Sequence, residues 1–160
     1  MNRKKWEREM ERAEREWRQA FEDHLARKGI FFERLTNEVK AASLKQRWLR
    51  TFAGDANISG ICTEPYMWHI FSFKRVGCYT EEEATKRFHA KRKKVCYLLF
   101  QHNDDAYVLK NPQAFTADDL CEHCDYMDVY VVDEFFRWTY VLTHEGDCGP
   151  YFCVAKKECV

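Results

Sequence analysis

The chain has 160 residues and a mass of 19.3 kDa, with 46% hydrophobic and 16% aromatic residues. This length provides one sizeable core but not two, so we expect a single domain over 1–160, with an N-terminal helix at 1–28 and a main α+β body at 37–160. No apolar run approaches the roughly 18 residues that cross a bilayer, and residues 1–9 carry no export signal. We therefore expect a cytoplasmic protein with no membrane partner, whose cysteines are reduced.

The net charge of zero conceals an uneven distribution. Residues 1–100 contain 22 Lys or Arg and 14 Asp or Glu, whereas residues 101–160 contain 4 and 12. Charged helices early in the chain and Asp-rich turns later would explain this asymmetry without any function. Alternatively, the late acidic residues form a face for a basic partner, because such charge raises encounter rates and selects partners.

The first segment is predicted to be a long amphipathic helix that ends near Gly29. Its two tryptophans are expected to enter the domain's own core, or alternatively to dock on a partner chain. Its mixture of Arg and Glu argues against binding to nucleic acid, because segments that bind nucleic acid are usually more strongly basic. The apolar residues that recur every three or four positions are Trp6, Met10, Ala13, Trp17, Phe21 and Leu25.

Two further helices are predicted in the first hundred residues. One covers 37–52, with Thr36 or Asn37 as its cap. After a loop rich in Gly and Asn, the aromatic residues within 66–73 are expected to be buried. The next helix starts at Thr80, where Thr80 and Glu83 match a capping box, and ends in the basic run 91–94. The residues of the 37–52 helix expected to face inward are Val39, Ala42, Leu49 and Phe52.

From residue 95 onward the pattern changes to strands. The continuous apolar run 95–100 predicts a strand covered on both faces, and 106–109, 129–132, 138–142 and 151–154 predict four more. A short helix is predicted to start at Thr116. Helices first and strands later predict an α+β fold: an antiparallel sheet of about five strands in the C-terminal half, with the long N-terminal helix and two further helices packed on one face.

Motifs at 68–73, 96–106, 129–133, 138–145 and 148–152 together resemble a family of small bacterial proteins described only as a domain of unknown function. The resemblance spans residues 48–152 and implies a bacterial or phage origin and a single cytosolic domain, but no activity. The late part of the pattern also resembles bacterial immunity proteins that neutralise toxins. The polar residues in these motifs are His69, His102, Asp104, Asp105, Asp133, Trp138, His144 and Glu145.

Cysteine and histidine residues bracket the strands predicted at 129–132 and 138–142. The residue before the first strand of a hairpin lies beside the residue after the second, so Cys121 and Cys124 would meet His144 and Cys148 at the open end. These four residues form a Cys3His set suited to zinc. Alternatively, the thiols are packing residues and the protein has no cofactor.

Two functions remain open. Imidazoles and carboxylates are present, but no spacing among them defines a reaction, and nucleophile elbows and phosphate loops are absent, so no catalytic residue is assigned. One candidate function is that of a small zinc-binding protein, or of a metal-dependent hydrolase or nuclease. We favour a non-enzymatic bacterial interaction module of the immunity or inhibitor type, which presents an acidic C-terminal face to a basic protein such as a toxin. That face is expected to contain Asp118, Asp119, Glu122, Asp125, Asp128, Asp133 and Glu134.

Overall fold

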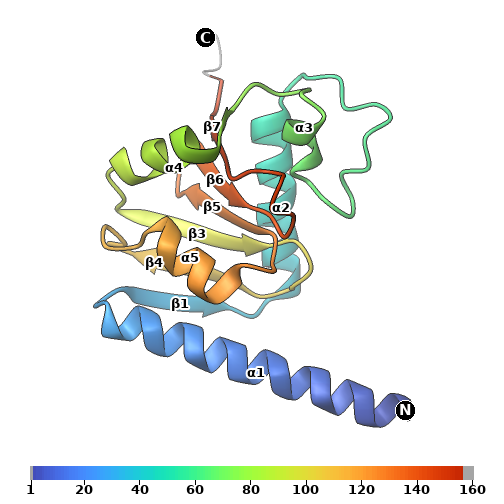
Figure 1. Ribbon diagram of the computed structural model, residues 1–160, viewed down its shortest axis with the longest axis vertical. Coiled ribbons are helices and arrows are strands. Elements are labelled where there is room, and N and C mark those ends of the chain that lie inside the picture. The colour runs from blue at the N-terminus through green and yellow to red at the C-terminus, as the bar shows by residue number, and fades with distance from the viewer. Residues whose placement is uncertain (1, 157–160) are drawn as a thin grey trace.

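The computed structural model describes residues 2–156 and has a seven-stranded antiparallel sheet at its centre, in the order β1-β4-β3-β5-β6-β7-β2 (Figure 1). The α+β class is confirmed, with seven strands in place of about five. The strands are β1 (Phe31–Leu35), β2 (Tyr79–Thr80), β3 (Val95–Phe100), β4 (Ala106–Lys110), β5 (Val129–Asp133), β6 (Trp138–Leu142) and β7 (Tyr151–Val154). The helices are α1 (Arg3–Arg27), α2 (Glu38–Ala53), α3 (His69–Ser72), α4 (Glu81–Ala90) and α5 (Ala117–Cys124).

Helices cover both faces of this sheet (Figure 1). On one face, Phe21 of α1, Phe88 of α4 and Leu120 of α5 pack against the strands. On the other face, the packing residues include Trp48 of α2 and Phe71 of α3. The expectation of helices on one face was wrong, because successive apolar residues of β3 and β5 point alternately into the two clusters and both sides must be covered.

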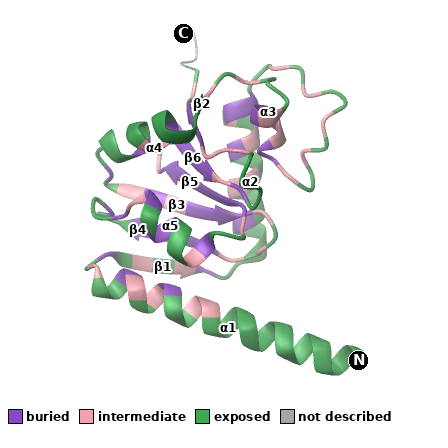
Figure 2. Cartoon of the chain, viewed as in Figure 1, coloured by how far each residue is buried: buried purple, intermediate pink, exposed green. Residues whose placement is uncertain are grey.

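Helix α1 packs on the sheet through its C-terminal half only. Phe21 and Leu25 are fully buried, and the Trp17 indole Nε1 donates a hydrogen bond to the carbonyl of His123 at 2.7 Å. Residues 2–16 are all exposed, including Trp6 and Met10, each at 53% (Figure 2). The expectation that both tryptophans enter the core was therefore wrong for Trp6, which lies on the half of α1 that projects beyond the sheet.

Helix α2 begins where predicted, but it is rotated from the predicted orientation. The Asn37 side chain accepts hydrogen bonds from the backbone amides of Val39 and Lys40 at 3.0 and 3.2 Å, which confirms Asn37 as the N-cap. Val39 is 78% exposed and Ala42 is also exposed, so their predicted burial was wrong. The face of α2 that carries the large indole of Trp48 turns toward the core, where this side chain is fully buried. The buried residues of α2 are Ala41, Trp48, Phe52 and Ala53.

The two edge strands were not predicted. Strand β1 pairs with β4, and β2 pairs with β7 through only two residues. Thr80 belongs to β2 and makes no side-chain hydrogen bond to the start of α4, while Glu83 pairs with Arg87 at 2.9 Å. The expected capping box of Thr80 and Glu83 was wrong, because Glu81 at φ 54° departs from right-handed helical geometry between them and Glu83 pairs with Arg87 instead.

Candidate functional site

A buried carboxylate joins three separate segments at one end of the sheet. Asp128, immediately before β5, is 4% exposed. Its Oδ1 accepts hydrogen bonds from the Trp68 indole Nε1 and from the His144 backbone amide, both at 3.0 Å. The His144 ring Nδ1 lies 2.9 Å from the same oxygen. We call Asp128, Trp68 and His144 the Asp128 junction. It fixes the segment before α3 and the loop after β6 to the start of β5.

Three imidazoles gather beside this junction, around the ring of Tyr66. The ring centroids of His69, His102 and His144 lie 5.2, 5.5 and 5.2 Å from the Tyr66 centroid. His144 Nε2 also lies 3.6 Å from a carboxylate oxygen of Glu145. The structure therefore brings together four of the predicted motif residues from three parts of the chain. Asp133 and Trp138 lie at the opposite ends of β5 and β6 from this cluster.

The Asp128–His144 pair has the geometry of an oriented proton acceptor, but it lacks a nucleophile. A carboxylate that holds Nδ1 fixes an imidazole's tautomer and direction. Among residues 2–156, however, no hydroxyl or thiol is hydrogen-bonded to the ring of His144. The arrangement can hold or move a proton, and its hydrogen bonds stabilise the loops.

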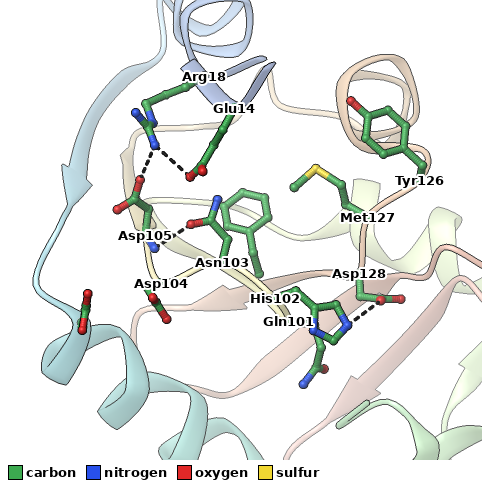
Figure 3. A pocket seen from close by; sticks show the side chains of 12 residues that line it. Glu14, Arg18, Gln101, His102, Asn103, Asp104, Asp105, Tyr126, Met127 and Asp128 are labelled. Carbon is green, nitrogen blue, oxygen red and sulfur yellow. Dashed lines mark hydrogen bonds and ion pairs between the residues drawn. The ribbon is translucent and has the colours of Figure 1, made fainter. Parts of the chain in front are cut away.

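An acidic cavity of about 480 Å³ opens next to the junction, between α1 and the β3–β4 turn (Figure 3). It adjoins a second, more apolar cavity of about 350 Å³ that runs along α1. Glu14, Asn103, Tyr126 and Met127 line both. We call the two cavities together the groove. Its remaining side chains include Met10, Ala13, Trp17, Arg18, Glu38, His102, Asp104, Asp105 and Asp128.

Carboxylates outnumber cations in the acidic half of the groove. One guanidinium nitrogen of Arg18 lies 3.0 Å from both Glu14 and Asp105 (Figure 3). Across the described chain, Glu38 and Asp104 make no ion pair within 4.0 Å. Lys45 is nearby, and burial lowers its pKa despite the opposing effect of the Asp104 charge. The groove therefore retains a negative potential that a cationic ligand would offset.

The seven residues predicted to form one acidic face are divided between surface and interior. Asp119, Asp128 and Asp133 are buried. Asp133 pairs with the Arg137 guanidinium at 2.7 Å, at the far end of β5 from Asp128. Burial was not anticipated because sequence spacing does not distinguish a solvated carboxylate from one satisfied internally. The members that remain exposed or half-buried are Asp118, Glu122, Asp125 and Glu134.

Asp119 connects α5 to the end of α1. Its carboxylate lies 2.5 Å from Lys28 Nζ, 2.7 Å from His24 Nε2 and 2.8 Å from the Thr116 backbone amide. Burial tends to raise the pKa of Asp119, but the hydrogen bonds from Lys28, His24 and Thr116 outweigh burial and lower it below 3.8. Asp119 is therefore ionised at neutral pH and stabilises the contact between the two helices.

We expect Asp119→Asn to change how stability depends on pH. Because the pKa of Asp119 is lower in the folded protein than in the unfolded chain, its ionised carboxylate stabilises the fold at pH values above 3.8. This stabilisation is lost as the pH falls from 3.8 through the lower pKa of the folded state. Urea unfolding should show the variant less stable than the wild type at pH 7, and the difference should shrink toward pH 3. The exposed neighbour provides a matched control, since Asp118→Asn should leave the pH profile close to that of the wild type. Parallel curves for Asp119→Asn and the wild type would contradict the assignment.

The four predicted zinc ligands do not converge. Cys121 and Cys124 lie on α5, where Cys124 is buried in the core and burial raises the pKa of its thiol to about 12. Cys148 donates to Glu145 at 3.4 Å, and the ring of His144 is held by Asp128. Asp128, which sequence reasoning placed on a surface, takes the position beside His144 that was expected for the cysteine pair. Within residues 2–156, three potential ligand atoms approach within 4.8 Å of one another only at His24, Glu122 and His123.

Several residues of the site were not identified from sequence. Arg18 and Glu14 were assigned only to the solvent-exposed face of α1, and Tyr66 only to a buried aromatic segment. The position of Asp128 directly before a strand was the available signal, because strand ends at one edge of a sheet lie close together. For Glu14 and Arg18 no local signal exists, since their role depends on where α1 docks.

A family model described as a domain of unknown function (DUF4275) matches residues 2–152. The chain matches no curated protein and no solved structure. Among the described helices, none combines the length and the apolar character that crossing a membrane requires.

Proposed function

Since the chain belongs to the DUF4275 family, whose description assigns no activity, we propose a function from its site alone: a non-enzymatic interaction module whose groove receives a basic segment of a partner protein. The observation that carries the proposal is the pairing of unneutralised carboxylates with an exposed apolar surface in one groove. A segment with a cationic side chain beside an apolar one would complement both halves.

Charge supports this choice of ligand. Glu14, Glu38, Asp104 and Asp105 line the acidic half, and Arg18 is the cation among them. The chain as a whole has no net charge, so the attraction is local to the groove. Local fields of this kind act over about one Debye length, roughly 8 Å at physiological ionic strength, and mainly raise association rates.

The apolar half supports binding to protein. Tyr126 is 69% exposed and Met10 is 53% exposed. Together with Trp17 they provide the aromatic and Met side chains that are enriched at interfaces between proteins. Trp6, one helical turn before Met10, continues the same stripe along the projecting part of α1. A bound segment can therefore extend along the helix beyond the groove.

The finer proposal is a bacterial immunity or inhibitor role. A toxin that cleaves nucleic acid has a basic active site, and an acidic groove beside aromatic anchors would cover such a surface. The acidic surface in this proposal lies at the groove, rather than along the late acidic residues as first expected. Only Asp128 is common to both sets, and its carboxylate is already used in the junction.

Affinity purification with matched variants tests the proposal. We expect wild-type protein, used as bait at low salt in native-host extract, to retain a defined basic protein. We expect Glu38→Lys/Asp104→Lys to weaken the recovered complex by more than about tenfold, which corresponds to about 1.4 kcal/mol. The control Glu33→Lys/Asp55→Lys makes the same change of charge on exposed residues outside the groove. Equal recovery by both double variants would reject the groove as the binding surface.

A further inference from the structure

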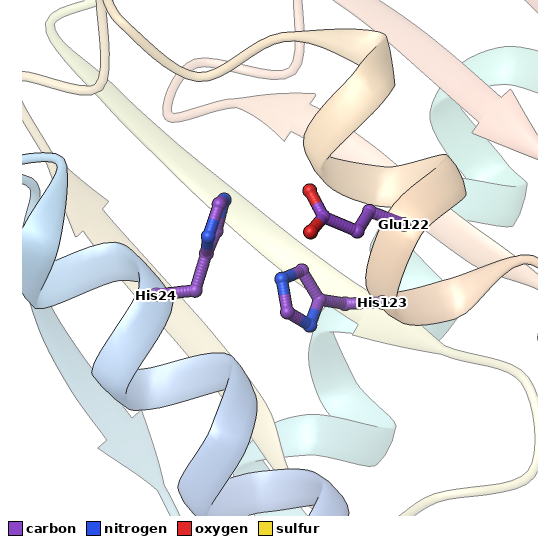
Figure 4. A group of neighbouring side chains, drawn as sticks. All are labelled: His24, Glu122 and His123. Atoms are coloured by element: carbon purple, nitrogen blue, oxygen red, sulfur yellow. The ribbon is translucent and has the colours of Figure 1, made fainter.

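A second site lies where the end of α1 meets α5, on the sheet face covered by those helices. His24 comes from α1, while Glu122 and His123 come from the last turn of α5. Their potential ligand atoms lie within 4.8 Å of one another. Figure 4 shows the two rings and the carboxylate turned toward a common space. The ring centroids of His24 and His123 are 4.3 Å apart.

One atom in this cluster lacks a partner that its burial requires. His123 Nε2 is inaccessible to solvent and makes no hydrogen bond within the described chain. Burying a polar nitrogen without a hydrogen-bond partner is unfavourable, because the nitrogen loses its contact with water and gains nothing in return. Burial, followed by the charge of nearby His24, also lowers the pKa of His123 below its usual value.

A carboxylate is hydrogen-bonded to the ring of His24, as is usual for histidines that bind metal ions. Its Nε2 lies 2.7 Å from Asp119, which leaves Nδ1 as the ring nitrogen available to an ion. A carboxylate behind a ligating imidazole fixes its tautomer and raises its basicity. Lys28 is paired with Asp119 at 2.5 Å, while the charge of Arg27 opposes a cation here and those of Glu122 and Asp119 favour one.

We propose that His24, Glu122 and His123 bind a divalent transition-metal ion, with Zn²⁺ as the best fit to two imidazoles and one carboxylate. Around an ion at about 2.1 Å from each ligand, the ligand atoms would lie about 3.4 Å apart, so small side-chain rotations close the site. Glu122 is exposed and free to make this movement. The fourth tetrahedral position is left to water. The ion joins α1 to α5 and satisfies His123 Nε2.

The test is a titration of chelator-treated protein with Co²⁺ and then Zn²⁺, because Co²⁺ reports its ligands spectroscopically. We expect one Co²⁺ per chain, with no thiolate-to-metal charge-transfer band, displaced by one Zn²⁺. His123→Ala should weaken binding by more than about 100-fold, since even outer-shell partners of a metal account for 10–100-fold. Glu122→Gln alters an exposed residue without threatening the fold and should weaken binding at least about tenfold.

Two matched variants separate this site from the alternatives. His102→Ala removes an exposed imidazole elsewhere and should leave the affinity unchanged. Cys121→Ser/Cys124→Ser should also leave Co²⁺ binding unchanged. A thiolate band that disappears in the cysteine variant would overturn the proposal in favour of cysteine ligation, and so would substoichiometric binding by the wild type. Affinity unaffected by Glu122→Gln and His123→Ala would overturn it as well.

Discussion

Asp128→Ala is expected to lower the free energy of unfolding by about 3–5 kcal/mol, because it removes the acceptor that holds the Asp128 junction together. The Trp68 indole and the His144 backbone amide would each lose a partner that lies at 3.0 Å. Trp68 is 1% exposed, so water cannot replace the lost acceptor without opening the core. Equilibrium urea unfolding, followed by fluorescence and far-ultraviolet circular dichroism, measures the change.

Two further variants define what the carboxylate contributes. Asp128→Asn keeps one oxygen acceptor of similar shape and should lose less stability than Asp128→Ala. Asp55, whose side chain is 94% exposed, supplies the control, because Asp55→Ala should stay within about 0.5 kcal/mol of the wild type. If Asp128→Ala cost no more than Asp55→Ala, the junction would not stabilise the fold as described.

Trp48→Ala should cost about 4–5 kcal/mol, because the indole is both the largest side chain of α2 in the core and a buried hydrogen-bond donor. It is fully buried, with ring centroids of Phe52, Phe71 and Tyr130 at 5.3, 5.8 and 4.8 Å. Its Nε1 donates to Thr139 Oγ1 at 2.8 Å. Removing it leaves a cavity that the packed sheet cannot close. The same unfolding measurement gives the loss.

Trp48→Phe separates packing from hydrogen bonding, since it retains an aromatic ring and loses only the donor and part of the volume. We expect it to cost less than half as much as Trp48→Ala. Trp6→Ala is the control for removing a tryptophan, and it should change stability by less than about 0.5 kcal/mol because Trp6 is 53% exposed. A large loss for Trp6→Ala would show that the start of α1 packs within the domain.

The elements with strong local signals were predicted. The 3.6-residue periodicity predicted α1 within one residue, the Asn37 cap predicted the start of α2, and segments rich in apolar and β-branched residues predicted five of the seven strands. The edge strands were missed for a physical reason. The two residues of β2 are too few to form a recognisable pattern. In β1, Glu33 and Arg34 interrupt the apolar residues, so this strand forms through its pairing with β4.

The site was less predictable than the fold, because it depends on docking between distant segments. His69, His102 and His144 were identified as notable residues, and they do meet around Tyr66. Asp128 was predicted to lie on an exposed acidic face. Instead it is buried, and its carboxylate accepts hydrogen bonds from Trp68 and His144. The groove could not be predicted, because it forms only where α1 docks beside the β3–β4 turn. The periodicity of apolar residues along one helix does not indicate where that helix docks.

The most direct test of the groove is a titration of ¹⁵N-labelled protein with a defined peptide, acetylated and amidated Gly-Leu-Arg-Phe-Lys-Gly, monitored by amide chemical shifts. We predict saturable shifts at Glu14, Asn103, Asp104 and Tyr126, weakened by salt and by Glu38→Lys/Asp104→Lys but not by Glu33→Lys/Asp55→Lys. A peptide with Glu in place of Arg and Lys should not bind. Shifts located elsewhere, or equal binding of the acidic peptide, would contradict the assignment of the groove to a basic partner segment.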